Sequence, residues 1–400
     1  MMQIVDPQTC TCCQACRLVC PVQCISVIED NEGFPAPYID NALCTDCGLC
    51  ASVCPENNRP ALTHNECIKV LGARYENDAM LCKSTSGGVF AGIALKLLEM
   101  PGASVFGCAF DENNVARHIC VDDAKLIASL QSSKYVQSDV GDTYLHAKVL
   151  LSEGKTVFYT GTPCQIAGLY AFLGRDYDNL LTADLICHGV PSPLLFRRYL
   201  DWIGNKYGGE ISYYGFRSRE KSGWGLMAKI VVMTKKKSKT RRVLLDADPY
   251  YRKFIEACTI RECCYNCQYA NSRRVADLTF GDFWGAEKLH PEFYDSRGIS
   301  VLLINTTKGD RFFGAVLDRF SIIETTLEKA VKKNQHLSKP SPRPVSRDLA
   351  FKNITDEDTD IFRSQVFKIS KVACISVYLR AAIKRVSPQM VIRLYRKIRH

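Results

Sequence analysis

One cysteine spacing, found twice near the start of the chain, constrains the fold more than any other feature of the sequence. Each copy has the form C-x2-C-x2-C-x3-C-P; the first begins at Cys10 and the second at Cys44. Beyond this duplicated motif, the 400 residues contain no internal repeat. A unit of this length cannot form a large hydrophobic core, so we expect metal groups bound by the cysteines to hold it together.

This spacing is typical of cysteines that hold two 4Fe-4S clusters in a ferredoxin-like unit. Three cysteines two residues apart wrap one cluster, and the proline turns the chain so that the fourth thiolate reaches the other cluster. The sequence therefore assigns Cys10, Cys13, Cys16 and Cys54 to one cluster, and Cys44, Cys47, Cys50 and Cys20 to the second. Cys12 and Cys24 lie off the pattern, and we predict that neither is a ligand.

Zinc and disulfide bonds are the alternatives to iron–sulfur clusters. Structural zinc usually takes two separated CxxC pairs, and a disulfide framework needs an oxidising compartment. The N-terminal MMQIVDPQTC shows neither the basic nor the apolar part of a secretory signal. No apolar run approaches the length of a membrane span of about eighteen residues. We therefore expect a cytoplasmic protein.

The excess of basic over acidic residues lies entirely in the C-terminal tail of the chain. The chain has 52 Lys and Arg against 42 Asp and Glu, and residues 361–400 hold ten of these basic residues and no acidic one. The rest of the chain is therefore balanced, which argues against a nucleic-acid partner. Apolar residues recur at helical spacing from Val366 onward. The tail either packs on the body or contacts an anionic membrane at its inner face.

The fold class that the sequence predicts is α+β or α/β, with a small two-cluster unit followed by a larger mixed α/β body. We expect the ferredoxin-like unit at residues 1–75, with a short strand at Gln3–Val5. The body follows in two parts, 76–175 and 176–338. A proline-rich linker, Lys339–Arg347, and a basic helical tail complete the chain in residues 339–400.

Loops at the ends of expected strands carry the candidate site residues of the body. Ser84, Ser86, Gly87 and Gly88 precede an apolar helix, where backbone N–H groups bind an anion such as a flavin phosphate or simply cap the helix. Cys164 follows the strand Lys155–Tyr159, and Cys187 follows the strand Leu180–Ile186. His188 is either a proton donor or a hydrogen-bonded core residue. The stretch from Ile211 to Asp246 alternates like antiparallel strands, with Lys235–Lys239 at a hairpin tip.

A third group of cysteines lies at Cys263, Cys264 and Cys267. Four thiols in the body, Cys164, Cys187, Cys264 and Cys267, could hold a third 4Fe-4S cluster. A redox-active CxxC pair together with two buried cysteines would give the same sequence pattern, so both interpretations stay open.

Several motifs in order make the resemblance of this chain specific. GTPCQIAGL, CHGVPSP and CCYNCQYANSRRVADLTFGDFWG, with STSGGVF and SKYVQS, resemble the beta-subunit family of coenzyme F420 hydrogenases and dehydrogenases, fused to a two-cluster ferredoxin domain. The resemblance implies FAD, iron–sulfur clusters, and reduction of a deazaflavin, a chlorophyll-type pigment or another substrate. Similar bacterial proteins are associated with surface-polysaccharide synthesis. Cys263 stands where similar proteins have serine.

These features together predict an oxidoreductase that takes electrons from a ferredoxin-like donor. The electrons would pass through the clusters to FAD, which exchanges one or two electrons, and on to an organic substrate. The alternative is an electron-transfer subunit that has no substrate of its own and serves a partner enzyme.

Replacement of Cys47 by serine should lower the iron content and disturb one cluster, whereas replacement of Cys12 should leave the iron content unchanged. Cys47 is the middle thiolate of a triplet, and Cys12 lies between two ligands with no free corner of a cluster to reach. Iron and sulfide assays on anaerobically purified variants measure the difference. Equal iron loss in both variants would contradict the ligand assignment.

Overall fold

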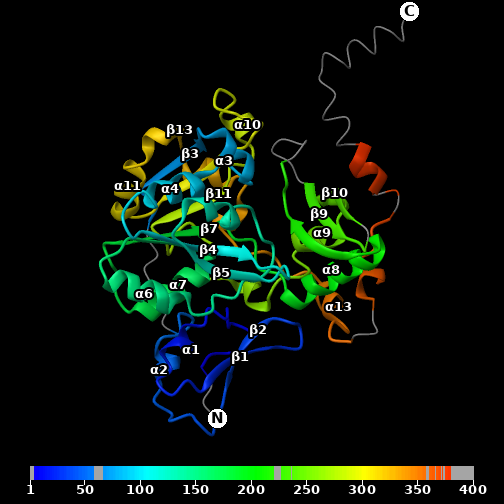
Figure 1. Ribbon diagram of the computed structural model, residues 1–400, viewed down its shortest axis with the longest axis horizontal. Coiled ribbons are helices and arrows are strands. Elements are labelled where there is room, and N and C mark those ends of the chain that lie inside the picture. The colour runs from blue at the N-terminus through cyan, green and yellow to red at the C-terminus, as the bar shows by residue number, and fades with distance from the viewer. Residues whose placement is uncertain are drawn as a thin grey trace, which may run out of the picture.

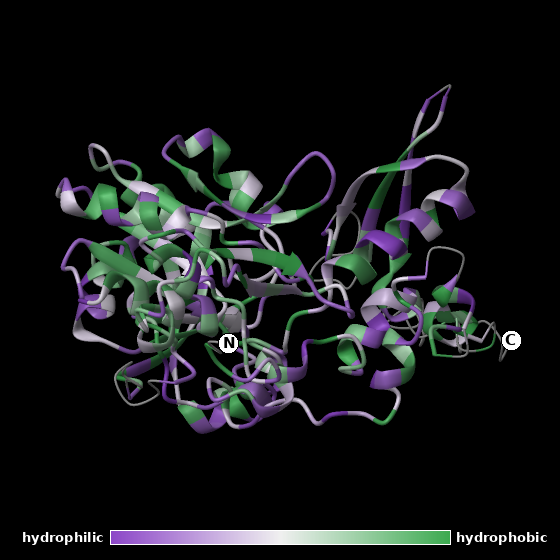
Figure 2. Cartoon of the chain, turned by 90° about the horizontal axis from the view of Figure 1, so that it is seen from below, coloured by the Kyte–Doolittle hydropathy of each residue, from purple (hydrophilic) through white to green (hydrophobic). Residues whose placement is uncertain are grey.

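The structure is a computed structural model that describes residues 4–57, 66–219, 227–235, 237–356, 360–364, 366–370, 372 and 374–379. A small N-terminal unit lies below a body built on a large mixed sheet, and a three-stranded sheet with its own helices lies beside that body (Figure 1). This arrangement confirms the predicted fold class. Helices cover both sides of the large sheet, whose strand segments are predominantly apolar (Figure 2).

The N-terminal unit consists of two short helices and one hairpin. A short helix begins within or next to each cysteine triplet, and the hairpin strands pair antiparallel from Ile25 opposite Ile39 to Glu29 opposite Pro35. The strand expected at Gln3–Val5 does not form at Ile4 and Val5, the two of these residues that the structure describes. The elements are α1 (Ala15–Val19), β1 (Ile25–Glu29), β2 (Pro35–Ile39) and α2 (Leu49–Ser52).

The large sheet has eight strands among the described residues, of which four neighbouring ones, β11, β7, β6 and β4, run parallel to one another. Parallel pairing joins β4 to β6, β6 to β7 and β7 to β11, and the other pairs are antiparallel. The strand order is β13 (Phe320–Thr325), β3 (Lys69–Tyr75), β12 (Ser300–Ile304), β11 (Leu278–Asp282), β7 (Leu180–Leu185), β6 (Val157–Gly161), β4 (Ser104–Phe110) and β5 (Ala116–Val121).

Successive side chains of these strands point to opposite faces, and each face is covered by helices. Val105 and Phe158 pack with α4 (Val89–Leu97) and with Phe313 of α11 (Thr307–Gly314) on one face. Phe106, Val157 and Tyr159 pack on the other face with α6 (Thr143–Ser152) and α7 (Pro163–Leu173). Because both faces are covered, the inner strands β7 and β12 are buried along nearly their whole length, whereas the edge strand β13 alternates.

The expected boundary of the ferredoxin-like unit at residue 75 lies too far along the chain. β3 pairs with β12 and β13 in the large sheet, so the N-terminal unit ends before Lys69. The short apolar run in β3 lacks the alternation that marks a half-exposed strand, because it is buried on both faces. Both expected parts of the body, 76–175 and 176–338, contribute strands to the same sheet.

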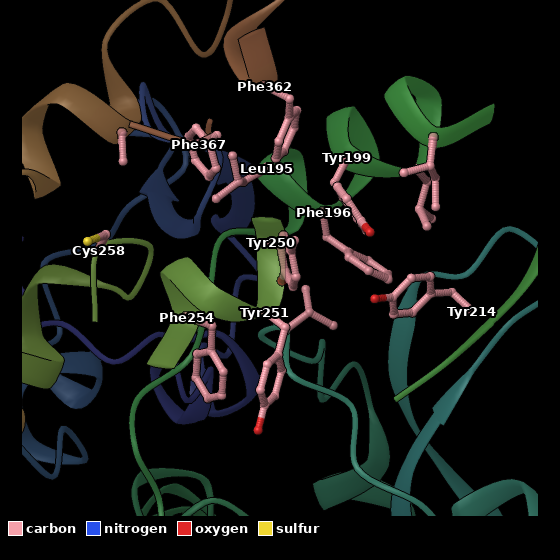
Figure 3. Close-up of a cluster of buried hydrophobic side chains, with 14 of the residues drawn as sticks. Leu195, Phe196, Tyr199, Tyr214, Tyr250, Tyr251, Phe254, Cys258, Phe362 and Phe367 are labelled. Carbon is pink, nitrogen blue, oxygen red and sulfur yellow. The ribbon is translucent and has the colours of Figure 1, made fainter. Parts of the chain in front are cut away.

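The second sheet carries the largest aromatic cluster of the described residues. Its order is β10 (Ser238–Leu244), β9 (Met227–Met233), β8 (Glu210–Gly215), as the alternating pattern at 211–246 predicted, and α8 (Pro193–Tyr207) and α9 (Pro249–Ile255) pack against it. Phe196 and Tyr199 of α8 meet Tyr214 and Tyr250 in this core (Figure 3). The hydroxyls of Tyr199 and Tyr214 both donate to the buried carboxylate of Asp248, which satisfies the polar groups of this core.

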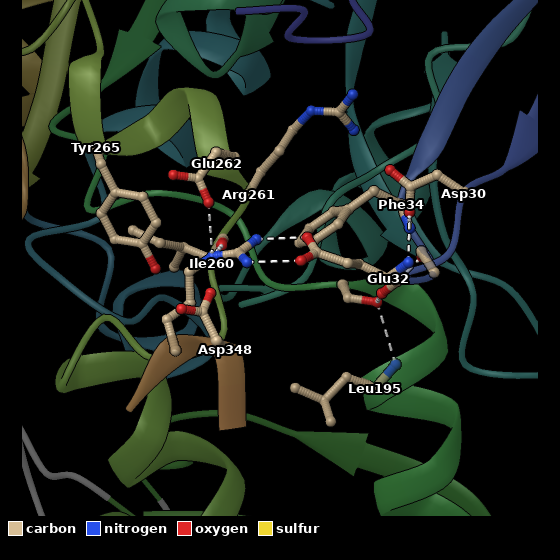
Figure 4. Close-up of polar contacts among 12 residues, drawn as sticks. Asp30, Glu32, Phe34, Leu195, Ile260, Arg261, Glu262, Tyr265 and Asp348 are labelled. Carbon is tan, nitrogen blue, oxygen red and sulfur yellow. Dashed lines mark hydrogen bonds and ion pairs between the residues drawn. The ribbon is translucent and has the colours of Figure 1, made fainter. Parts of the chain in front are cut away.

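The segment Lys339–Arg347, predicted as a linker, is exposed at Val345 but is anchored by its last residue, which is buried between the N-terminal unit and the body. Arg347, which begins α13 (Arg347–Phe351), is 1% exposed and donates to Glu32 in the turn between β1 and β2, with Nη1 2.6 Å from Oε1 (Figure 4). The Glu262 carboxylate lies 3.2 Å from Arg347 Nε. Its proline content made the segment read as a spacer, but two carboxylates from distant parts of the chain hold its arginine in place.

The tail begins by packing on the body, as one of the two alternatives predicted. Phe362 contacts the rings of Tyr199 and Trp202, with centroids 5.3 and 5.6 Å apart, and Phe367 is buried beside it. Farther on, Val372, Ile375 and Leu379 are exposed. Residues 380–400, which carry most of the basic side chains, lie outside the described residues. Within the described part of the chain, no helix has both the length and the apolar character needed to span a membrane.

Truncation after Phe367 should abolish binding to anionic vesicles if the exposed apolar stripe contacts a membrane. Each Lys or Arg near an anionic surface contributes about 1 kcal/mol, so the full chain should bind anionic but not neutral vesicles, and salt should weaken the binding. Co-sedimentation of both proteins measures this. Keeping Phe362 and Phe367 in the truncated protein preserves the aromatic core. Equal sedimentation of the two proteins would show that the tail is a packing element.

Candidate functional site

The first cavity of the N-terminal unit is lined by the four cysteines assigned to one cluster. Cys10, Cys13, Cys16 and Cys54 surround it, together with Cys12 and the apolar side chains of Ile4, Val5, Val27 and Pro37. Cys12 adopts a left-handed backbone conformation, with φ 51°, and its N–H donates to Cys10 Sγ over 3.4 Å. A buried set of four thiols with a backbone donor fits a 4Fe-4S cluster.

The second cavity is lined by the four cysteines assigned to the other cluster. Cys20, Cys44, Cys47 and Cys50 surround it, and Cys24 is the fifth thiol, with its Sγ 3.4 Å from Cys20 Sγ. Each N-terminal cavity thus has one extra cysteine. The structure brings the two predicted ligand sets together, and the exclusion of Cys12 and Cys24 as ligands stays a prediction.

The environment of the thiols fits ligands that lose a proton to bind iron. Burial raises the pKa of Cys13 and raises that of Cys16 to about 12, and the backbone N–H groups of Ala15 and Arg17 oppose this rise. The same amide donors would stabilise the negative charge of sulfur bound to iron. Assembly of a cluster here must therefore release protons.

The first cavity lies directly against the body. Cys13 packs into the core beneath α7, and a Cβ atom on Gly168 of that helix would lie 2.6 Å from Cys13 Cβ. Arg261 of the body donates from Nε to the carbonyl of Cys10 over 2.7 Å and from Nη1 to that of Pro35 over 2.8 Å. These contacts fix the position of the first cysteine set relative to the body.

A third cavity, of about 140 Å³, gathers the cysteines of the body. Cys164 lies in the first turn of α7 after β6, and Cys187 follows β7; these parallel strands are neighbours, so their carboxyl ends meet at one edge of the sheet. The segment before β11 brings Cys264 and Cys267 to the same edge. The structure therefore places together the four thiols Cys164, Cys187, Cys264 and Cys267 that the sequence suggested as a third ligand set.

Cys263 is a fifth thiol in this third cavity, which the predicted ligand set left out. The thiol of Cys264 and the guanidinium of Arg261 hold the pKa of Cys263 below its usual range, although burial opposes them. Burial raises the pKa of Cys164 and raises that of Cys267 to about 12. The adjacent cysteines in RECCYNC were the sequence signal for this extra thiol.

A buried ion pair holds the cysteine-bearing loop onto the sheet. Arg274 and Asp184 are 1% and 0% exposed at their side chains, and Arg274 Nη2 lies 2.9 Å from Asp184 Oδ1. Arg274 also donates to the carbonyls of Tyr269 and Leu185, over 2.8 and 3.0 Å. Neither residue was identified from the sequence, because nothing local distinguishes them from surface charges.

No single metal-ion position emerges from these cavities: the described residues contain no group of three or more His, Cys, Asp or Glu side chains placed to hold one ion. The three cavities are instead each lined by four or more thiols.

The loop Ser84–Gly88 is held by the sheet on one side. Gly87 N–H donates to Ser300 Oγ over 2.9 Å, and a Cβ atom on Gly87 would lie 2.2 Å from the carbonyl oxygen of Ala73. Ser84 accepts from Gln131, and Ser86 donates to the carbonyl of Ile299. The groups of Ser84, Ser86 and Gly87 are therefore engaged by protein, and Gly88 caps α4 with φ 77°.

Two arginines lie near this loop with part of their hydrogen-bonding capacity unused. Arg219 donates to the carbonyls of Leu81 and Ser86, and Arg217 pairs with Asp282. The Nε atoms of both arginines are buried and have no partner among the described residues. Unsatisfied buried donors of this kind fit an anionic group such as a phosphate.

His188, predicted as either a proton donor or a hydrogen-bonded core residue, has both ring nitrogens engaged. Nε2 lies 3.0 Å from the carbonyl of Phe254 and therefore carries the proton, and Nδ1 accepts from His336 Nε2 over 2.7 Å. Burial lowers the pKa of His188 to about 4. His188 thus lines the third cavity as a neutral, hydrogen-bonded residue, which favours the core alternative.

Comparison with known proteins gives two family matches and several similar solved chains. Residues 154–330 match the family model for the C-terminal part of the beta subunit of coenzyme F420 hydrogenase/dehydrogenase, and residues 9–58 match that of the 4Fe-4S dicluster domain. No curated protein matches the chain. A chain from the F420-reducing [NiFe] hydrogenase complex of Methanosarcina barkeri, solved after xenon derivatization, is 18% identical; the match covers 68% of this chain and 91% of that chain, with a TM-score of 0.43.

The dicluster unit and the cysteine-rich body define an iron–sulfur protein of the electron-transfer class. Residues 154–330 carry the C-terminal domain of the coenzyme F420 hydrogenase/dehydrogenase beta-subunit family, and a 4Fe-4S dicluster domain precedes it at residues 9–58. The resemblance inferred from the motifs is confirmed, as are the two clusters expected in the N-terminal unit.

Replacement of Gly168 by alanine should loosen the contact between the first cluster and the body. The new methyl group would overlap Cys13, and such overpacking costs about 1–3 kcal/mol. We expect faster loss of iron to a chelator and a lower unfolding temperature. Gly314 at the end of α11 is the matched control, because nothing lies within 4 Å of its Cβ position. Identical iron retention in the two variants would contradict the proposed contact.

Proposed function

We propose that this protein is an electron-transfer subunit that carries electrons between an external partner and a flavin in its body, through three 4Fe-4S clusters in series. The observation that carries the proposal is the continuity of the cavities. Thr11 and Glu56 line both the first cavity and the third one, so the two cavities share a wall. A partner enzyme, rather than this chain, would hold the organic substrate.

The cavities are ordered from the surface of the N-terminal unit into the body. The second cavity is lined entirely by residues of the N-terminal unit, the first adjoins α7, and the third is lined by residues of both units. Burial raises the pKa of Cys10 in the first cavity, and the thiol of Cys263 in the third cavity lies close enough to raise it further; Arg261 contacts both regions. Electron transfer becomes faster as centres come closer, so this order supports stepwise transfer from the second cavity through the first to the third.

The chain's own residues have three tasks in this relay. Cys164, Cys187, Cys264 and Cys267 would hold the third cluster, Arg274 fixes their loop on the strand ends, and apolar side chains exclude water from the first cavity. His188 is neutral and supports the loop after β7 through Phe254 and His336.

FAD, which the family resemblance implies, would supply the exchange between one-electron and two-electron transfer. The guanidinium of Arg219 is the group that would hold its phosphates, because the groups of Ser84, Ser86 and Gly87 in the expected loop are already engaged by protein. The buried Nε of Arg219 lacks a partner among the described residues, which supports this placement. No observation on the described residues favours a particular organic substrate, so surface-polysaccharide chemistry is not part of the proposal.

Iron, sulfide and flavin contents of anaerobically purified protein test the proposal together. Three clusters require about twelve iron atoms per chain, and two clusters about eight. Replacement of Cys187 by serine should remove about four irons and leave the two N-terminal clusters intact, as judged by electron paramagnetic resonance. Cys82 is the control, because it is exposed and lies in none of the three cavities. Eight irons in the unaltered protein would exclude the third cluster, and absence of flavin would exclude the FAD assignment.

A further inference from the structure

The second cysteine cavity differs from the other two in that one of its thiols is exposed. All of its lining residues come from the range 20–50, and none comes from the body. Its thiol Cys47 is exposed, whereas the other three assigned ligands in this cavity are partly or fully buried. An external protein can therefore approach this centre more closely than either of the others.

Apolar side chains surround Cys47 at the surface. Val22 and Leu49 line the cavity and are 41% and 46% exposed, and Leu43, which directly precedes Cys44 in the chain, is 57% exposed. Asp46 is exposed next to Cys47, with its carboxylate 3.7 Å from Cys44 Sγ. We call Val22, Leu43, Cys47, Leu49, Asp40 and Asp46 the outer face.

The charge of the outer face is negative. Residues 18–57 contain six acidic residues and no Lys, Arg or His. Glu29 and Glu32 are paired with Arg197 and Arg347 of the body. Asp40 and Asp46 make no ion pair with the cations that the structure describes, so their charge remains on the outer face.

We propose that the outer face is the docking surface for a one-electron carrier protein that presents lysine and arginine side chains around an apolar centre. Apolar contact over the exposed thiol brings the two redox centres together, and the rim charges guide the approach. An acidic carrier would meet repulsion from Asp40 and Asp46 here. The inference rests on the proposed function in one respect, the presence of a cluster in the second cavity.

The electron step itself is simple. A 4Fe-4S cluster in its reduced 1+ state returns to the 2+ state as one electron passes to the carrier, and no proton or bond is exchanged. A basic c-type cytochrome is a suitable probe, because its ferric haem takes up that electron and its colour changes. An acidic ferredoxin is the opposite probe.

The experiment follows the oxidation of the full-length, chemically reduced holoprotein in an anaerobic stopped-flow instrument. The second-order rate constant with the basic cytochrome should fall as salt increases, because attraction between opposite charges is screened. Replacement of Asp46 by lysine should lower this rate about fivefold at low ionic strength and flatten its salt dependence. With the acidic ferredoxin, the same replacement should raise the rate.

Two further variants distinguish weaker docking of the carrier from damage to the cluster. Replacement of Leu43 by serine should slow the cytochrome reaction without changing its salt dependence, because Leu43 does not line the cavity. Asp201→Lys, at an exposed position on α8, changes the net charge equally and should leave the rate unaltered. A small neutral oxidant should react alike with all variants.

Equal cytochrome rates for Asp46→Lys, Asp201→Lys and the unaltered protein would overturn the inference. A rate with the cytochrome that rises with salt would overturn it as well. If the proposed function fails, the protein will lack iron or flavin. The docking surface is tested separately, on protein whose spectra show that the N-terminal clusters are present.

Discussion

The buried guanidinium of Arg261 is the interaction on which the arrangement of the centres depends. It is shared by two carbonyl oxygens of the N-terminal unit and lies over the ring of Phe34, 5.5 Å from its centroid. A buried cation is costly unless its donors are satisfied, so the N-terminal unit has to lie where it meets them. The residue two positions later is Cys263, which lines the third cavity. One side chain thereby fixes the first cysteine set and the third relative to each other.

Arg274 acts on the other side of the same cavity. Its ion pair with Asp184 is fully enclosed, and its remaining donors bind carbonyls of the loop and of β7. Such a pair contributes little net stability against an apolar replacement, but removal of either partner leaves a buried charge. The pair therefore defines one position for the loop that carries Cys264 and Cys267, and a cluster ligand set needs one defined position. The two arginines clamp the cysteine-rich segment from both ends.

Features that depend on residues close together in the sequence could be predicted, and contacts between distant residues could not. The two ligand sets of the N-terminal unit follow from spacing within fifty residues, and the strands that end before Cys164 and Cys187 follow from apolar runs and turns. β3 was not predicted, because its burial on both faces removes the alternation of apolar and polar residues. The prolines of segment 339–347 predict a linker, although its last residue, Arg347, is buried. The contacts of Arg261, Arg274 and Arg347 join residues 251, 90 and 315 positions apart, and no pattern along one chain encodes such pairs. The chemistry of the His188 imidazole makes it a candidate proton donor, but its hydrogen-bond partners Phe254 and His336 lie 66 and 148 positions away in the chain.

The ion pair between Arg347 and Glu32 means that the dicluster unit is not an independent module fused to the body. A ferredoxin joined to an enzyme by a spacer is a module that can be removed or exchanged without harm to the rest. Here the body carries buried cations, Arg261 and Arg347, whose partners include the turn between β1 and β2 and the first cysteine loop. A gene encoding the body alone would leave the ring of Phe351 and the guanidinium groups of Arg261 and Arg347 without their contacts in the dicluster unit. The two coding segments are thus bound to be inherited together, and recombination could exchange the dicluster unit only for one that already offers Glu32 and the carbonyls of Cys10 and Pro35.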